Sequence, residues 1–316
     1  MKLSVLFPET RSLSHVDELA RRSEVLGFHG MFLGSAFGFD PVMALAAAGP
    51  HTERLLLGTA VVPTWPRHPL VAAQQAATAN VLCDGRFRFG VGPSHVPVMN
   101  MYGIVYEKPI RHVREYLTVV GALLDDGKVS FRGEQYQVVG FLDVERAGRP
   151  PVLLATLHEQ MCRVAGRHAD GALSWLAPPA YVADIVVANV QAGARDASRP
   201  APPVIAEMPC YLSTDRDAVH EAVRRDLAIY PQMPFYRDVL VRAGVPDATE
   251  ASTSGWTDAM IDAVVPWGDE DQLALHVQAY LDVGADEVVL SPYGCGPDPA
   301  ANADDALEVL GAIARG

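Results

Sequence analysis

Short β-branched runs alternate with longer amphipathic stretches along this chain, and the alternation predicts how the chain folds. Such alternation is typical of βα units that build a parallel sheet. The runs expected to form strands are Leu3–Phe7, Gly30–Leu33, Leu55–Val62, Phe87–Val91, Val152–Ala155, Ala172–Trp175, Val204–Leu212 and Glu287–Leu290. Eight strands separated by helical stretches predict an α/β fold, a closed (β/α)8 TIM barrel.

Two helices can be bounded from local signals. Ser14–Asp17 resembles a capping box, and Gly27 supplies the stop signal of the helix that follows it. Pro109 can open a second helix, which Gly127 would end. Its apolar stripe at helical spacing is Val113, Tyr116, Leu117, Val120, Leu123 and Leu124.

Two segments depart from the alternation and are expected to be insertions after strands 4 and 7. Residues 127–150 contain two short β-rich runs around Gly133, which predict a small hairpin. The stretch from Tyr230 to Trp267 is rich in proline and polar residues and predicts a helical excursion with a loop. Neither the insertions nor any repeat divides the chain, so residues 1–316 are expected to form a single domain.

Composition narrows the range of partners. The chain has 316 residues, 49% of them apolar, and a net charge of −13, which disfavours nucleic acid and anionic membranes as partners. No segment has the length of a signal peptide or a membrane span, so a cytoplasmic location is expected. The four cysteines lie far apart without metal-type spacing, which predicts neither a disulfide framework nor a metal site.

The chemistry of a (β/α)8 barrel is expected on the loops that follow its strands, because all strand C-termini open on one face. These loops are rich in aromatic and small residues and poor in carboxylates. That composition favours a bound aromatic cofactor over hydrolysis, which usually needs paired carboxylates or a metal cluster. The small residues Gly58–Ala60 would let the backbone pass close beneath a flat ring.

Three segments carry a resemblance to a known family. They are Leu57–Pro69 (LGTAVVPTWPRHP), Gly90–His95 (GVGPSH) and Met101–Arg111 (MYGIVYEKPIR). The chain resembles the luciferase-like monooxygenase superfamily, and within it the branch of coenzyme F420-dependent oxidoreductases, over nearly its whole length.

The resemblance implies a barrel, usually a homodimer, that acts on a small-molecule substrate with F420 as cofactor or, alternatively, flavin mononucleotide (FMN). It implies a non-prolyl cis peptide bond beneath the cofactor ring within Thr59–Val61, and phosphate contacts at Ala155–Glu159 and Trp175–Pro178. The cofactor-binding residues expected on this basis are Thr59, Ala60, Val61, Ala155, Thr156, Leu157, His158, Trp175, Leu176 and Ala177.

The residues expected to take part in chemistry are Ser35, Ser94 and His95 at the mouth of the barrel. A mouth histidine can relay protons near neutral pH, although a cofactor contact or a solvated loop explains His95 equally well. The residues expected to border the substrate are Phe37, Trp65, Tyr102 and Tyr106, the two tyrosines being equally able to anchor their own loop.

The chain departs from its relatives at two places. Many relatives have Gly-Pro after strand five, where this chain has His158-Glu159, and this changes the expected phosphate contact. Many F420 enzymes have Asp-His after strand two, where this chain has Ser35-Ala36, so a familiar proton donor is missing.

A cationic cluster lies at the start of the helix opened by Pro109. Lys108, Arg111, His112 and Arg114 can receive an anionic cofactor tail, or can form ordinary surface pairs such as Glu107 with Arg111 and Arg111 with Glu115.

Three functions are compatible with the sequence. They are hydride transfer with F420, an FMN-dependent monooxygenase that uses reduced flavin and oxygen, and a barrel that has lost its activity.

Overall fold

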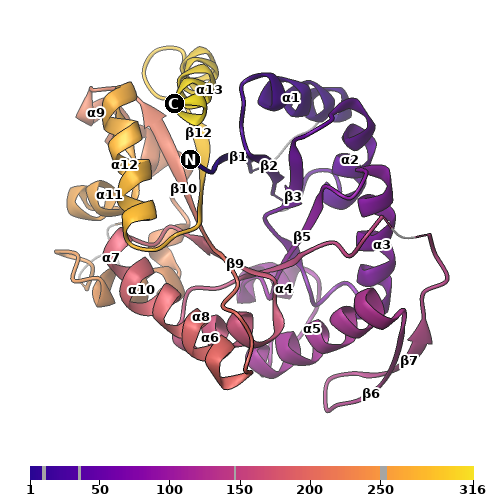
Figure 1. Cartoon of the computed structure of the whole chain (residues 1–316). Helices are drawn as coiled ribbons and strands as arrows, with labels where there is room; N and C mark the ends of the chain where they lie inside the picture. Colours follow the sequence, from indigo (N-terminus) through magenta and orange to yellow (C-terminus); the bar gives the residue numbers. More distant parts are fainter. Residues whose placement is uncertain (9–11, 35–36, 146, 250–254) are drawn as a thin grey trace.

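The computed structural model describes residues 1–8, 12–34, 37–145, 147–249 and 255–316, and within them eight parallel strands close into a barrel (Figure 1). Strand β12 pairs with β1, and β9 pairs with β10, so the ring is complete. The barrel strands are β1 Leu3–Phe7, β2 Gly30–Leu33, β3 Leu56–Thr59 continued by β4 Val62–Pro63, β5 Phe87–Gly92, β8 Val152–Ala155, β9 Gly171–Trp175, β10 Val204–Leu212 and β12 Glu287–Tyr293. The chain is a (β/α)8 barrel, as expected.

Helices surround the strands and bury their apolar faces against them (Figure 1). They are α1 Leu13–Val25, α2 Pro41–Ala48, α3 Pro69–Leu82, α5 Pro109–Asp126, α6 Glu159–His168, α7 Pro179–Tyr181, α8 Ala188–Asp196, α9 Arg216–Asp226, α12 Glu270–Asp282 and α13 Pro299–Arg315. Short helical turns occupy Gly49–His51 and Tyr230–Gln232, and a π-helix covers Val182–Val187. None of the described helices is long and apolar enough to cross a membrane.

Local signals located α5 correctly and missed the start of α1. Helix α5 begins at Pro109 and ends before Gly127, whose φ of 73° is the left-handed conformation that glycine adopts easily. Helix α1 is capped by Ser12, whose side chain accepts a hydrogen bond from the backbone N–H of His15. The capping box expected at Ser14–Asp17 is therefore wrong, because this segment already lies in the first turn.

The predicted hairpin after barrel strand 4 is present and packs outside α5 (Figure 1). Its strands are β6 Lys128–Arg132 and β7 Gln137–Phe141. The buried carboxylate of Glu115 on α5 accepts hydrogen bonds from three successive backbone N–H groups of the turn, those of Glu134, Gln135 and Tyr136. Burial raises the pKa of Glu115, but these three donors outweigh burial and hold its pKa below the ordinary value.

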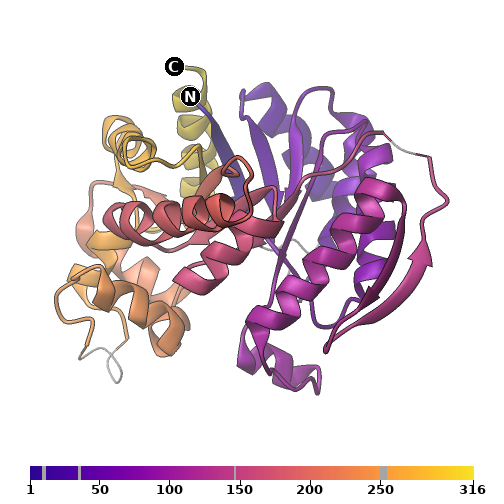
Figure 2. The ribbon, with the colours of Figure 1, turned by 60° about the horizontal axis from the view of Figure 1, so that its bottom comes forward.

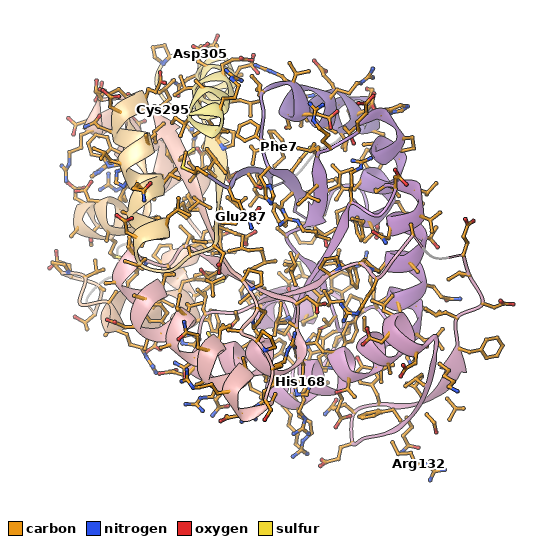
Figure 3. The ribbon with its side chains drawn as sticks, in the orientation of Figure 1. Phe7, Arg132, His168, Glu287, Cys295 and Asp305 are labelled. Carbon is orange, nitrogen blue, oxygen red and sulfur yellow. The ribbon has the colours of Figure 1, made fainter. Side chains whose placement is uncertain are left out.

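The inside of the barrel has a charged layer below an apolar one. Arg88 donates to both carboxylate oxygens of Glu287 at 2.7 and 2.9 Å, and Ser4 donates to the same carboxylate at 2.5 Å. Figure 3 shows Glu287 in the middle of the ring of strands. The apolar layer consists of Leu6, Phe32, Leu153, Leu173, Ile205 and Val289. This interior is packed, so any ligand must bind above it.

The insertion after barrel strand 7 contributes α10 Pro234–Arg242, α11 Asp258–Val264 and the short strand β11 Trp267–Gly268. This confirms the expected helical excursion. Together with the short helix α4 Val96–Met101, which the sequence did not predict, it lies at the end of the barrel opposite the two chain termini (Figure 2). That end is where the strands finish, so the excursion lies over the mouth of the barrel.

Candidate functional site

The floor of the mouth is built from small residues on adjacent strands. A cis peptide bond joins Ala60 and Val61, which confirms the expected position. The single strand predicted at Leu55–Val62 is two strands in the structure, β3 and β4. Thr59 donates a hydrogen bond to the carbonyl of Gly90 at 2.7 Å and ties this segment to β5. A Cβ atom on Gly92 would lie 2.9 Å from side-chain atoms of both Val61 and Ala155. The floor therefore has no room for larger side chains.

An aromatic group forms the wall above β4. The indole of Trp65 stacks on the imidazole of His112, with ring centroids 3.5 Å apart, and Tyr106 lies 5.6 Å from Trp65. Burial lowers the pKa of His112 to about 4 against a smaller opposing effect of Glu115, so the imidazole is neutral at neutral pH. Its Nε2 lies 2.9 Å from the hydroxyl of Thr64. These contacts fix the orientation of Trp65 at the mouth.

A second aromatic group joins the neighbouring part of the rim, after β5 and β8, to the excursion. His95, at the start of α4, packs on Tyr236 of α10 with ring centroids 5.6 Å apart. His158, at the start of α6, packs edge-on against Phe235 at 4.2 Å. Burial lowers the pKa of both histidines below the ordinary value; for His158 the nearby Asp238 opposes this effect without reversing it. Both imidazoles are therefore mainly neutral at neutral pH.

The other expected site residues lie in different settings. Thr156, Leu157, Leu176 and Ala177 are buried. Phe37 and Tyr102 are exposed, and Ser94 has a left-handed φ of 61° next to His95. Trp175 ends β9, half buried and 6.1 Å from the ring of Tyr230. Ser35 lies outside the described residues.

The cationic cluster at the start of α5 forms contacts different from those expected. Arg111 pairs with Glu134 of the hairpin turn, and Lys108 lies 4.0 Å from the same carboxylate. Glu115 is occupied by backbone N–H groups and His112 is buried against Trp65. The pairs expected along the helix, Glu107 with Arg111 and Arg111 with Glu115, are therefore wrong, because the hairpin provides nearer partners.

Sequence reasoning missed one acid that the fold brings to the mouth, Glu207 on β10. It is only 5% exposed, and its Oε1 has no hydrogen-bond partner among the described residues. Burial raises its pKa to about 8, and nearby Glu287 adds to this effect while Arg88 opposes it. A glutamate inside the otherwise apolar run Val204–Leu212 was the available signal.

A shallow cavity of about 290 Å³ lies at the other end of the barrel, where the strands begin. Its lining includes Glu24, whose carboxylate accepts hydrogen bonds from the backbone N–H groups of residues 53–55. This carboxylate maintains the local fold. The mouth combines small and aromatic residues with one buried acid, Glu207, whose Oε1 has no partner among the described residues, and is therefore the candidate site.

The floor suits the face of a flat ring, because Ala60, Gly92 and Ala155 carry no long side chain and a Cβ at Gly92 would push against Val61 and Ala155. The segment expected to contact the cofactor's phosphate, at the start of α6, has both positive and negative side chains around it. At the start of α6, Arg242 is held by Glu159 at 2.5 Å and by Asp238 at 2.7 Å, close to His158. An anionic tail can bind there only if Arg242 turns away from these carboxylates towards it.

Comparison with known proteins gives a consistent set of relatives. The sequence model of the luciferase-like monooxygenase family matches residues 1–287. An F420-dependent glucose-6-phosphate dehydrogenase of Nakamurella multipartita is 28% identical, over 89% of this chain and 87% of its own. The structure of an F420-dependent secondary alcohol dehydrogenase, with an F420-acetone adduct, has a TM-score of 0.79 at 19% identity, covering 99% of this chain and 98% of its own. An EDTA monooxygenase from Chelativorans sp. has a TM-score of 0.78 at 17% identity, covering 100% and 93%.

Proposed function

The chain belongs to the luciferase-like monooxygenase family, and we propose that within it the chain is an oxidoreductase that exchanges hydride between coenzyme F420 and a small organic molecule. The observation that carries the proposal is the floor of small residues at the mouth, Ala60, Val61, Gly92 and Ala155, which lies below aromatic walls. We call this floor the shelf. The named relative that uses F420, at 28% identity, supports this cofactor over others.

The residues of this chain have distinct tasks in the proposed reaction. The shelf supports the ring, and Ala155–His158 and Trp175–Ala177 are assigned to the phosphate side, as the family resemblance implies. When bound, the reduced deazaflavin supplies a hydride from ring carbon 5. Trp65 and Tyr106 border the substrate on one side and exclude water from it. We expect Phe37 and Tyr102, which are exposed, to contact larger substrates.

His95 and Ser94 link this site to solvent. His95 is half buried, packs on Tyr236 of the excursion, and is mainly neutral because burial lowers its pKa. A neutral imidazole can accept a proton on one nitrogen and release one from the other. His95 is therefore proposed to relay protons between solvent and the interior of the mouth, and Ser94 holds the turn that precedes it.

The second candidate is a monooxygenase that uses reduced FMN and oxygen, and the description of the matching family favours it. The same shelf can support either tricyclic ring. Oxygen activation is poor on a ring whose position 5 is carbon, so the identity of the cofactor decides the type of reaction.

Equilibrium titration of the purified protein with F420 and, separately, with FMN tests the proposal. We expect clearly tighter binding of F420, followed by reoxidation of the reduced cofactor with a member of a panel of enones, ketones and cyclic imines. Micromolar or tighter binding of FMN without binding of F420 would overturn the proposal and favour the monooxygenase.

A further inference from the structure

Glu207 points into the same chamber as the proposed ring shelf. The side chain of Ile205, two residues earlier on β10, belongs to the apolar layer inside the barrel, and alternation along a strand puts Glu207 on the same face one level higher. Its Cα partners are Trp175 on β9 and Val289 on β12. Trp175 and Val61 both pack on that apolar layer, so Glu207 and the shelf face one space.

The order of strands puts Glu207 across this space from the shelf. Between β10 and β3 the barrel has three strands on one side, β12, β1 and β2, and three on the other, β9, β8 and β5. Strands β10 and β3 are therefore diametrically opposed in a ring of eight. A substrate seated on a ring at Ala60–Val61 would present its far side to Glu207.

The surroundings keep Glu207 protonated. Below it, Glu287 is already paired with Arg88, so Arg88 has no bidentate contact left to offer. Above it, the excursion contributes Tyr230 and Tyr236, whose own pKa values burial raises. Burial and the charge of Glu287 outweigh Arg88 and raise the pKa of Glu207 to about 8. The acid therefore holds a proton at neutral pH, when His95 and His158 are mainly neutral imidazoles.

We propose that Glu207 is the acid that protonates the substrate as it accepts a hydride, which restricts the substrates to those with a polarised double bond such as C=O or C=N. The proposal rests on the proposed function. The hydride bonds to carbon, the proton of Glu207 bonds to oxygen or nitrogen, and the double bond becomes single. The hydride and its two electrons would come from the reduced deazaflavin, whose remaining proton would pass to solvent. The Glu207 carboxylate would then take up a proton from solvent through His95.

The substitution Glu207→Gln tests this role, because it keeps the shape of the side chain and removes the acidic proton of the carboxyl group. Glu207→Asp keeps the acid, and Glu53→Gln makes the same chemical change at an exposed residue at the other end of the barrel. With reduced F420 bound, we expect Glu207→Gln to slow single-turnover reduction of a ketone or imine about 10²–10⁴-fold at neutral pH while the affinity for F420 is kept. The wild-type rate should fall as the pH rises above about 8, and the variant should lose this dependence.

Infrared spectroscopy of the cofactor-free protein gives a readout that does not depend on turnover. The wild-type spectrum minus that of Glu207→Gln should contain the carbonyl stretch of a neutral carboxylic acid at neutral pH, and the band should disappear above about pH 8. Partial activity in Glu207→Asp would support the role of the acid.

Two results would overturn the inference while the proposed function stands. One is full-rate turnover by Glu207→Gln, and the other is a carboxylate at position 207 at neutral pH. Failure of the wild-type protein to bind F420 would instead overturn the proposed function and, with it, the part of Glu207 in that reaction.

Discussion

The raised pKa of Glu207 predicts how the free energy of unfolding depends on pH, and this can be tested without cofactor or substrate. Its pKa is about 8 in the folded chain and 4.5 as the ordinary value, so the folded state binds this proton more strongly than the unfolded state. The bound proton on Glu207 stabilises the folded state relative to the unfolded state. This stabilisation is complete below pH 4.5 and is lost as the pH rises through about 8. Each pH unit in that window removes about 1.4 kcal/mol, or about 5 kcal/mol in all.

The difference in unfolding free energy between the wild-type protein and Glu207→Gln isolates this effect, because the other titrating groups are common to both chains. Urea unfolding across the window should show the wild type losing about 1.4 kcal/mol per pH unit relative to the variant, with a level difference on either side. Glu53→Gln, measured in parallel, controls for removal of one exposed carboxylate. A difference that stays level across the whole window would refute the argument that burial keeps Glu207 protonated.

Three further predictions concern the mouth and the assembly. His95→Ala should slow turnover about 10²-fold at unchanged cofactor affinity, and a proportional loss of affinity would make His95 a binding residue instead. Gly92→Ala should weaken cofactor binding about tenfold in a titration, because its Cβ pushes against Val61, whereas Gly121→Ala, whose Cβ meets little, should bind normally. Light scattering should report a homodimer of about twice the 34.0 kDa chain mass, and a monomer would contradict the family expectation.

The barrel could be predicted because its strands obey local rules. The bounds of β1, β2, β8 and β10 agree with the sequence pattern, since β-branched runs between helical stretches have few alternative structures. The split between β3 and β4 was not predictable from hydrophobicity, because Leu55–Val62 is one uninterrupted small and apolar run.

The site was harder to predict because its contacts join distant parts of the chain. His95 could be assigned to the mouth by its position after a strand, but its contact with Tyr236 depends on how the excursion folds back. Glu207 looked like an isolated charge in a strand, and its importance emerges only when the direction of its side chain and the closure of the ring are known. Pairings such as Arg111 with Glu134 likewise depend on the hairpin rather than on helical spacing.

The single carboxylate that binds the hairpin turn sets a condition for anyone shortening this protein. Residues 128–141 form a two-stranded sheet of their own and could be cut from a minimal scaffold without breaking a barrel strand. The cut would remove the three backbone N–H groups that donate to Glu115 and, with them, the turn that covers its carboxylate. A trimmed version should therefore keep a polar side chain at position 115, because the deletion exposes this face of α5 to solvent.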